Sequence, residues 1–471
     1  MPELSSSDNY PTWMGMVFVF NLIIGTGALT LPSAFSHAGW LGGLAMVILV
    51  GFISYVTVTF VIEAMASANA ILHHRALMKR ATAREAHFSD DSDTTENAPL
   101  VAEENVMFSL SSRVEMGEMA TIYFNGPGII AFYLCIAIYL YGDLSIYAAA
   151  IGTSLKDVIC ESNVNATMDT PCWSNHEITR FGCYRLCVVA TGLFLGPFVF
   201  FNVQKTKYIQ MLTVVFRVCA FTAMILMALI RLMRNGAEGH PSTISPSGIP
   251  RAFGACIYSF MCHHSLPSLL APVREKKHLS WQLPLDFILI ATFYVLLGIT
   301  GVFAFENIED LYTLNFLDTP SEGFMRIIGY FLALFPVFTL SASLPVVAIT
   351  LRNNLAAIFA RGQQPSFLRR AILPLLALLP AFGVTLLTDS VSSLVGFTGA
   401  FAGAGVQYLT PVILVYCARR YVSLTLPDAP VNPHRSPFHH SAWLIIVIAW
   451  CTLGVTFVTV NFFSHIFQQH Y

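Results

Sequence analysis

The stretch that decides the fold is NLIIGTGALTLP, residues 21–32, in the middle of the first apolar segment. Two glycines, two threonines and a proline interrupt an otherwise apolar helix. Glycine weakens a helix, and proline removes a backbone donor and clashes with the preceding turn. Unpaired backbone groups inside a bilayer are tolerated only where they line a cavity or bind a ligand. The stretch therefore predicts a broken membrane helix, whose free amides suit a carboxylate and whose free carbonyls suit a cation.

The composition of the whole chain agrees with a membrane location for this stretch. The 471 residues are 55% hydrophobic and 11% charged, whereas soluble proteins carry about 25% charged residues. A soluble globular enzyme and a disordered chain are thereby excluded. The net charge of −2 gives no electrostatic footprint for nucleic acid. The composition indicates a polytopic membrane protein, with the lipid bilayer as its surroundings.

Eleven segments are long and apolar enough to span a bilayer as helices, for which about 20 residues are needed. The predicted spans are 13–35, 39–69, 127–154, 183–202, 209–232, 250–271, 282–305, 324–350, 367–387, 391–418 and 442–465. The sequence thus predicts an all-α polytopic membrane protein with 11 transmembrane helices.

A second interruption, SFMCHHSLP, occupies residues 259–267 of the sixth span. Its Ser265-Leu266-Pro267 lies at a position similar to that of Thr30-Leu31-Pro32, five spans later. Matching breaks in two halves indicate an inverted repeat with a binding site near the midplane. Because five is odd, the halves must have opposite topology. The competing interpretation is that glycine and proline are simply common in membrane helices.

The distribution of positive charge predicts the orientation of the chain. If the N-terminus is cytoplasmic, the cytoplasmic segments hold 17 of the 25 Lys and Arg residues and the opposite side holds seven. Cytoplasmic loops normally carry this excess. With eleven spans, the C-terminus is then outside or lumenal. The sequence leaves open whether the membrane is the plasma membrane or a lysosomal or endosomal membrane.

The outside loop 155–182 contains the only glycosylation sequon, at Asn165. It also contains Cys160 and Cys172, for which an oxidising compartment favours a disulfide. Two free thiols, or a bridge to Cys183, are the alternatives.

Two other segments are predicted to lie wholly outside the bilayer: a cytoplasmic tail at 1–12 and a disordered cytoplasmic loop at 71–112. Residues 419–471 are predicted to form a cytoplasmic loop followed by the eleventh helix. The 71–112 loop is too polar to bury a core and could bind a cytosolic partner. Residues 420–441 contain His434, His439 and His440. We interpret that stretch as a solvated loop in preference to a metal site.

Charged groups deep in a bilayer are costly and mark functional sites. Asp143 lies about 16 residues, or roughly 24 Å, into the third span and shares a helix face with Tyr139 and Tyr147. Its depth in the span makes it a candidate functional residue. The alternative is a structural pair with Arg217, a deep basic residue that could also serve as a cytoplasmic gate.

Two further polar residues are weaker candidates. Glu63 lies roughly 35 Å past Trp40 along a helix, which places it near the inner interface and in a gating position. His263 lies beside the second break and could gain or lose a proton near neutral pH, or it could bond freed backbone groups.

These motifs resemble the amino acid/auxin permease family of the amino acid–polyamine–organocation superfamily. The resemblance rests on Asn21–Gly27, on Cys262-His263 and on PVVAITLR at residues 345–352. It implies a transporter core at 13–418, made of a five-plus-five inverted repeat (13–232 and 250–418), with broken helices 1 and 6 and one extra C-terminal helix.

In sodium-coupled members of that family, an Asn in span 1 and a hydroxyl in span 8 help to hold sodium. The resemblance implies these roles for Asn21 and Ser343. The family often has proline after Cys-His, whereas this chain has His264, which changes the local geometry.

The sequence predicts a secondary transporter of small amino acids or related carboxylates, coupled to sodium or protons by alternating access. The substrate carboxylate would meet the amides of Thr26, Gly27 and Ala28. Tyr139, Asp143, Cys262 and His263 would complete the substrate site, with Asp143 and His263 as proton sites. No catalytic motif, resident metal or cofactor is expected. The alternative is an amino acid sensor of the same fold with little transport; the sequence shows no channel filter.

Overall fold

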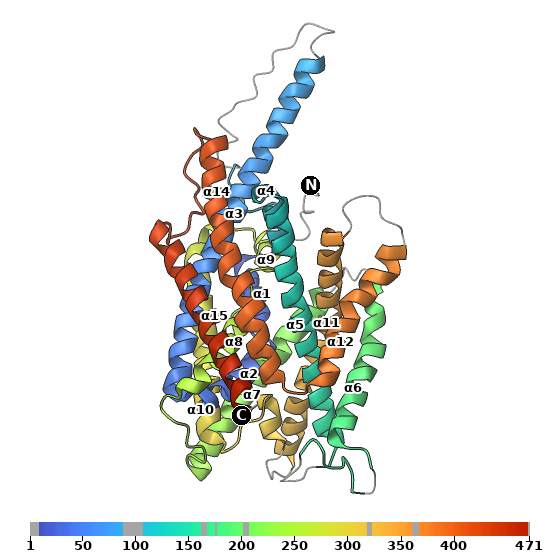
Figure 1. Cartoon of the computed structure of the whole chain (residues 1–471). Coiled ribbons are helices and arrows are strands. Elements are labelled where there is room, and N and C mark those ends of the chain that lie inside the picture. Colours follow the sequence, from blue (N-terminus) through green and yellow to red (C-terminus); the bar gives the residue numbers. More distant parts are fainter. Residues whose placement is uncertain are drawn as a thin grey trace.

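The computed structural model describes residues 9–87, 107–161, 167–174, 177–200, 207–317, 323–359 and 367–469 (Figure 1). These residues are almost entirely helical, and within them the only β-type pairing is two isolated bridges, Tyr10 with Val273 and Pro171 with Thr179. The expected all-α membrane fold is confirmed.

The helices follow one another along the chain with short connections between most of them. They are α1 (Thr12–Ile23), α2 (Thr26–Ala38), α3 (Trp40–His87), α4 (Met116–Tyr123), α5 (Gly126–Ile159), α6 (Arg180–Leu195), α7 (Lys207–Asn235), α8 (Ile249–Ser259), α9 (Leu266–Leu270), α10 (Leu279–Ala304), α11 (Phe324–Phe359), α12 (Leu373–Leu387), α13 (Val391–Thr398), α14 (Thr410–Thr425) and α15 (Ser441–Gln469). Between α13 and α14 the chain continues as two π-helical turns, η9 (Gly399–Gly403) and η10 (Gly405–Leu409).

Nine helices in the described residues are long and apolar enough to cross a membrane. The pair α1 and α2, bent by 52° at the break, makes a tenth. The expected span at 250–271 is divided into α8, of 11 residues, and α9, of five. The predicted count of eleven is therefore not confirmed, because neither fragment is long enough by itself.

Connections at the two ends of the helix bundle alternate along the chain (Figure 1). The ends of α3 and α14 lie at the upper end in this view, whereas the loop between α5 and α6 and the end of α15 lie toward the lower end. This grouping is the one that the charge distribution predicts. The assignment of the upper end to the cytoplasm stays a prediction.

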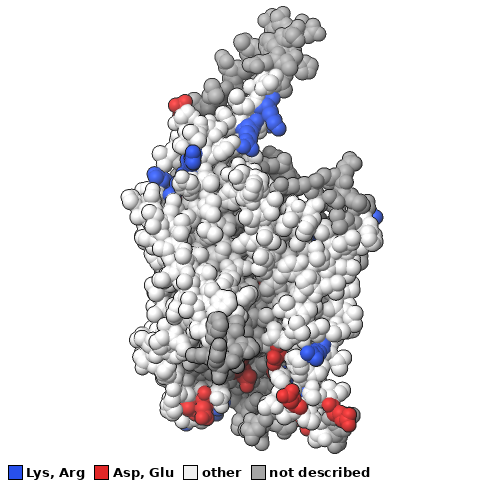
Figure 2. Space-filling view, viewed as in Figure 1, with Lys and Arg blue, Asp and Glu red and all other residues white. Residues whose placement is uncertain are grey.

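The surface has the charge pattern of a membrane protein (Figure 2). On the face shown, Lys and Arg gather mainly at the upper end and Asp and Glu at the lower end, with a broad uncharged band between them. Large apolar side chains are exposed on the long apolar helices: Leu193 of α6, Leu379 of α12 and Leu453 of α15 are each at least 65% exposed. Such exposure is favourable only where lipid replaces water.

Residues 71–87, expected to belong to a disordered loop, form the last turns of α3. The sequence ILHHRALMKRATAREAH is rich in Ala, Leu, Met, Lys and Arg, which are strong helix formers. Helix propensity therefore outweighs the lack of a buried face. Farther on, Phe108 and Leu110 are buried, so the part of 71–112 that the structure describes is ordered at both ends. Residues 88–106 lie outside the described part.

The packed interior is built by the inward faces of α2, α3, α5, α8 and α10, and α11 lies along α5. Close approach is achieved through small residues. A Cβ on Gly254 of α8 would lie 2.0 Å from the carbonyl oxygen of Gly396 on α13. Membrane helices without a strong hydrophobic driving force rely on such small-residue contacts, and here they hold the broken helices in the centre.

Candidate binding site at the two helix breaks

The first break separates α1 from α2 at Ile24 and Gly25. The bend leaves carbonyl groups at the end of α1 without helical partners, and other helices supply the donors. Arg217 of α7 donates to the carbonyl oxygens of Asn21 and Ile24, the latter at 2.8 Å. Tyr294 of α10 donates its hydroxyl to the carbonyl oxygen of Ile23 at 3.0 Å. A buried protein cation thus occupies the position where the sequence predicts a free cation.

Two polar side-chain atoms at this break have no hydrogen-bond partner. The side-chain oxygen of Asn21 and the hydroxyl of Thr26 are both buried and unpaired. Beside them, a Cβ built on Gly25 would meet nothing within 4 Å, so there is open space. Buried polar atoms are normally satisfied. Unpaired oxygens next to open space are the arrangement expected of a ligand site.

The amides expected to hold a substrate carboxylate are only partly available. The first amides of a helix have no partner within it, which holds for Thr26 and Gly27 at the start of α2. The amide of Ala28, however, donates to the carbonyl oxygen of Gly25 at 3.2 Å. The expectation that Ala28 is a free donor is wrong, because the first turn of α2 closes tightly onto Gly25.

The second break follows α8 and is built around buried polar residues. Cys262 and His263 are fully buried. The Nε2 atom of His263 lies 2.8 Å from the hydroxyl of Thr57 on α3. The Nδ1 atoms of His263 and His264 are buried without partners. The break therefore exposes two imidazole nitrogens to the interior of the protein.

Asp143 faces this second break from α5. The hydroxyl of Tyr258, at the end of α8, donates to the Asp143 carboxylate. The ring of Tyr139 lies 6.3 Å from that of Tyr258 and 5.5 Å from that of His264. Arg217 is occupied by the carbonyls of α1. The alternative that Asp143 and Arg217 form a structural pair is therefore wrong, since each has other partners.

The structure does not join the two expected sodium ligands. The side-chain oxygen of Asn21 has no partner, whereas the hydroxyl of Ser343 on α11 donates to the carbonyl oxygen of Thr339 at 3.2 Å. Helix α11 packs chiefly on α5, and α1 packs on α10, α9 and α7. The expected roles of Asn21 and Ser343 remain predictions.

Glu63 of α3 is held in a buried ion pair. Arg419 of α14 donates to both of its carboxylate oxygens at 2.8 Å, and the amide of Ser436 donates at 3.0 Å. Ser436 is 2% exposed. The expected solvated loop is therefore anchored here, because a buried carboxylate requires donors. The three loop histidines form no candidate metal cluster within the described residues.

Three residues of this region were not singled out in the sequence: Tyr258, Tyr294 and Asp286. The hydroxyl of Tyr294 lies 2.8 Å from the carbonyl oxygen of Ser259 as well as 3.0 Å from that of Ile23, so its single proton is shared between the two breaks. Asp286 of α10 is 5% exposed, and its Oδ2 atom has no hydrogen-bond partner. A carboxylate inside the predicted span 282–305 was a signal that could have identified Asp286.

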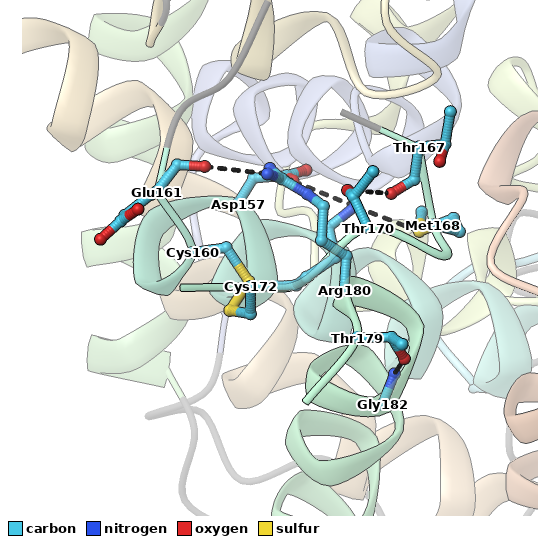
Figure 3. The surroundings of a disulfide bond; sticks show 11 residues. Asp157, Cys160, Glu161, Thr167, Met168, Thr170, Cys172, Thr179, Arg180 and Gly182 are labelled. Carbon is cyan, nitrogen blue, oxygen red and sulfur yellow. Dashed lines mark hydrogen bonds and ion pairs between the residues drawn. A yellow bond between two sulfur atoms is a disulfide. The ribbon is translucent and has the colours of Figure 1, made fainter. Parts of the chain in front are cut away.

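The loop between α5 and α6 is cross-linked (Figure 3). Cys160 and Cys172 form a disulfide bond. Arg180 donates to the carbonyl oxygen of Glu161 at 2.8 Å and pairs with Asp157 at 3.4 Å. The thiol of Cys183 lies within 4.8 Å of both disulfide sulfurs. Asn165, the predicted glycosylation site, lies outside the described residues.

A family model described as "Transmembrane amino acid transporter protein" matches residues 9–90 and 100–459. The chain therefore belongs to this family of membrane transporters, and the expected resemblance is confirmed. One solved structure with a similar arrangement is a mutant manganese transporter from Eremococcus coleocola. Its TM-score is 0.44 and its sequence identity 12%, over 95% of this chain and 93% of that one.

Within this class, the chain is similar to proteins called transmembrane protein 104. It is 48% identical over 509 residues to the homolog from Drosophila melanogaster, over 98% of this chain and all of that protein. It is 44% identical over 480 residues to the protein from Homo sapiens, over 96% of each. Stretches such as 21–32, 139–147 and 258–269 predict this likeness, and the relatives confirm it.

Proposed function

We propose that this protein is a secondary active transporter of small amino acids or related carboxylates, coupled to sodium or protons by alternating access. One observation carries the proposal. The break between α1 and α2 combines open space beside Gly25 with unpaired oxygens on Asn21 and Thr26. Membership of the amino acid transporter family supports the substrate class.

The substrate carboxylate would bind the amides of Thr26 and Gly27 at the start of α2, where the helix dipole favours negative charge. The substrate amino group would be directed toward the second break, where Asp143 and the rings of Tyr139 and Tyr258 lie. A zwitterion would thus be held between the two breaks. The close contact of α2 and α8 at Gly27 and Ser259 brings the two breaks next to each other.

Uptake into proteoliposomes tests the proposal. The purified chain would be reconstituted, and each of a panel of radiolabelled amino acids and small carboxylates would be offered under a sodium gradient, a pH gradient or neither. We expect accumulation of at least one compound under one gradient. Empty liposomes and the Thr26→Val variant are the controls. No gradient-dependent uptake of any compound would contradict the proposal, and binding without flux would favour the sensor alternative.

A further inference from the structure

We propose that Asp286, together with the second helix break, forms the binding site for a monovalent cation, a proton or sodium, that drives transport. This inference rests on the proposed function for its role in coupling, but the site itself is argued from geometry alone. Its starting point is the unpaired Oδ2 atom of a carboxylate that is only 5% exposed.

Asp286 is on the inward face of α10. Leu283, Phe287 and Ile290 on the same face are buried, whereas Leu285, Ile288 and Leu289 are exposed on the opposite face. The ring of Phe287 stacks on that of Phe260 with centroids 6.2 Å apart. The carboxylate is therefore positioned by packing against the residues that follow α8 and is not turned toward lipid.

The second break lies directly beside this face. Tyr294, eight residues or roughly 12 Å along α10 from Asp286, donates to the carbonyl oxygen of Ser259 at the end of α8. Phe260, the first residue after α8, stacks on Phe287, which is next to Asp286 in the chain. The C-terminal end of a helix carries partial negative charge, as at α8. A buried carboxylate next to it makes the surroundings favourable to a positive charge.

No cation of the protein neutralises this charge in the described residues, where neither Asp286 nor Asp143 belongs to an ion pair. Several other ionisable side chains near α10 are engaged elsewhere. His263 bonds Thr57, and both Arg217 and Tyr294 bond carbonyl groups at the end of α1. Lys276 donates to the carbonyl oxygens of Leu270, Ala271 and Val273. Glu63 pairs with Arg419, and the ring of Tyr55 lies against that of Phe287.

An unneutralised carboxylate in a bilayer is costly. A cation that arrives from outside would remove this cost and would bind best in the conformation that buries the site. Such binding couples the cation to the conformational change. For sodium, carbonyl oxygens of the residues that follow α8 would complete the ligand set, whereas a proton would need only the carboxylate.

The first test measures the cation directly on purified protein in detergent. Melting temperatures of wild type would be recorded in NaCl against choline chloride at constant pH, and across pH in choline chloride alone. We expect a shift of at least about 2 °C in one series for wild type and Asp286→Glu, and its loss in Asp286→Asn. The outward-facing substitution Thr292→Val on the same helix is the matched control. If Asp286→Asn loses the sodium-dependent shift in melting temperature, the bound cation is sodium. If it loses only the pH-dependent shift, the bound cation is a proton.

The second test measures coupling in proteoliposomes with the labelled amino acid that wild type accumulates. Asp286→Asn is expected to lower gradient-driven accumulation roughly tenfold or more while exchange of internal for external substrate stays within about twofold of wild type. If wild type transports nothing, the proposed function fails and the melting series still decides the site. Identical melting curves for wild type and Asp286→Asn in both series, or full gradient-driven accumulation by Asp286→Asn, would overturn the cation site.

Discussion

The break between α1 and α2 contains its own cation, whereas the break after α8 is flanked by carboxylates. At the first break, the guanidinium of Arg217 and the hydroxyl of Tyr294 satisfy three carbonyl oxygens of α1. At the second, Asp143 approaches from α5, and Asp286 lies on the face of α10 that packs against the residues after α8. Both breaks follow the C-terminal end of a helix, where positive charge is favoured.

The difference indicates that the first break is stabilised by a permanent charge of the protein, whereas the second can accept a cation from outside. Arg217 is 8% exposed and has no acidic partner in the described residues, so its charge is balanced by carbonyl dipoles alone. It stabilises a bend that the sequence of α1 and α2 cannot stabilise by itself. The second break lacks such a residue and is left with unpaired nitrogen and oxygen atoms. We infer that the first break orients the substrate and that the second break binds the coupling cation, a proton or sodium.

The largest effect is expected from removing the fixed cation. Arg217→Met leaves two buried carbonyls without their donor, at about 1–3 kcal/mol for each. We expect a lower melting temperature in detergent and no uptake in proteoliposomes. Arg217→Lys is the control, since it keeps the charge but not the planar guanidinium, and it should recover part of the melting temperature. Wild-type stability and uptake in Arg217→Met would show that the first break needs no built-in cation.

The second effect tests the carboxylate on α5. Asp143→Asn removes the charge but retains an oxygen that can accept the Tyr258 hydroxyl, so the fold should survive. We expect uptake to fall to background while the melting temperature stays near that of wild type. Tyr258→Phe, which leaves the carboxylate without its donor, should lower stability as well. If uptake by Asp143→Asn is unchanged, the Asp143 carboxylate is not needed for transport, and the backbone at Gly25–Gly27 provides the polar contacts to the substrate.

A matched glycine pair distinguishes packing from ligand space at the first break. The Cβ of Gly27→Ala would lie 2.7 Å from the Cα atom of Ser259, so α2 must move away from α8, at about 1–3 kcal/mol. The Cβ of Gly25→Ala meets nothing within 4 Å. We expect Gly27→Ala to lower the melting temperature, and Gly25→Ala to raise KM with little change in stability. Equal melting temperatures for the two variants would mean that α2 and α8 are not in close contact.

The smallest effect is expected far from both breaks, at the end of α7. Arg231 and Asn235 donate to Glu238 at 3.0 and 2.7 Å, and these bonds hold the pKa of Glu238 below its usual range. A lowered pKa in the folded state stabilises the protein above the unfolded pKa, and this contribution is lost as pH falls through the folded pKa. Glu238→Gln should lower the melting temperature slightly at neutral pH. The difference from wild type should disappear in acid; a difference that grows in acid would contradict the assignment.

The membrane fold and the position of both breaks could be predicted from the sequence. Apolar length determines which segments cross the bilayer, and the clusters of Gly, Pro and polar residues at 21–32 and 259–267 mark where helices cannot continue. The end of α3 differs from the predicted loop, because the residues of 71–87 favour a helix although many of them are polar. The site was predicted in part: Asp143 and the residues at the breaks lie together, whereas the role of Arg217 was not foreseen.

The sequence alone thus determined where most of the chain enters the bilayer, where its helices break, and that Asp143 and Arg217 are charges within the spans. Only the tertiary structure decided how those charges are partnered. Nothing in the local sequence of Arg217 or Tyr294 indicates that each reaches a carbonyl near Asn21, about 200 and 270 residues away in the chain. Hydrogen-bond partners are set by distances in the packed state, and these depend on all the helices together. For the same reason, only packing shows that Asp143 has a partner and that Asp286 retains an unpaired oxygen.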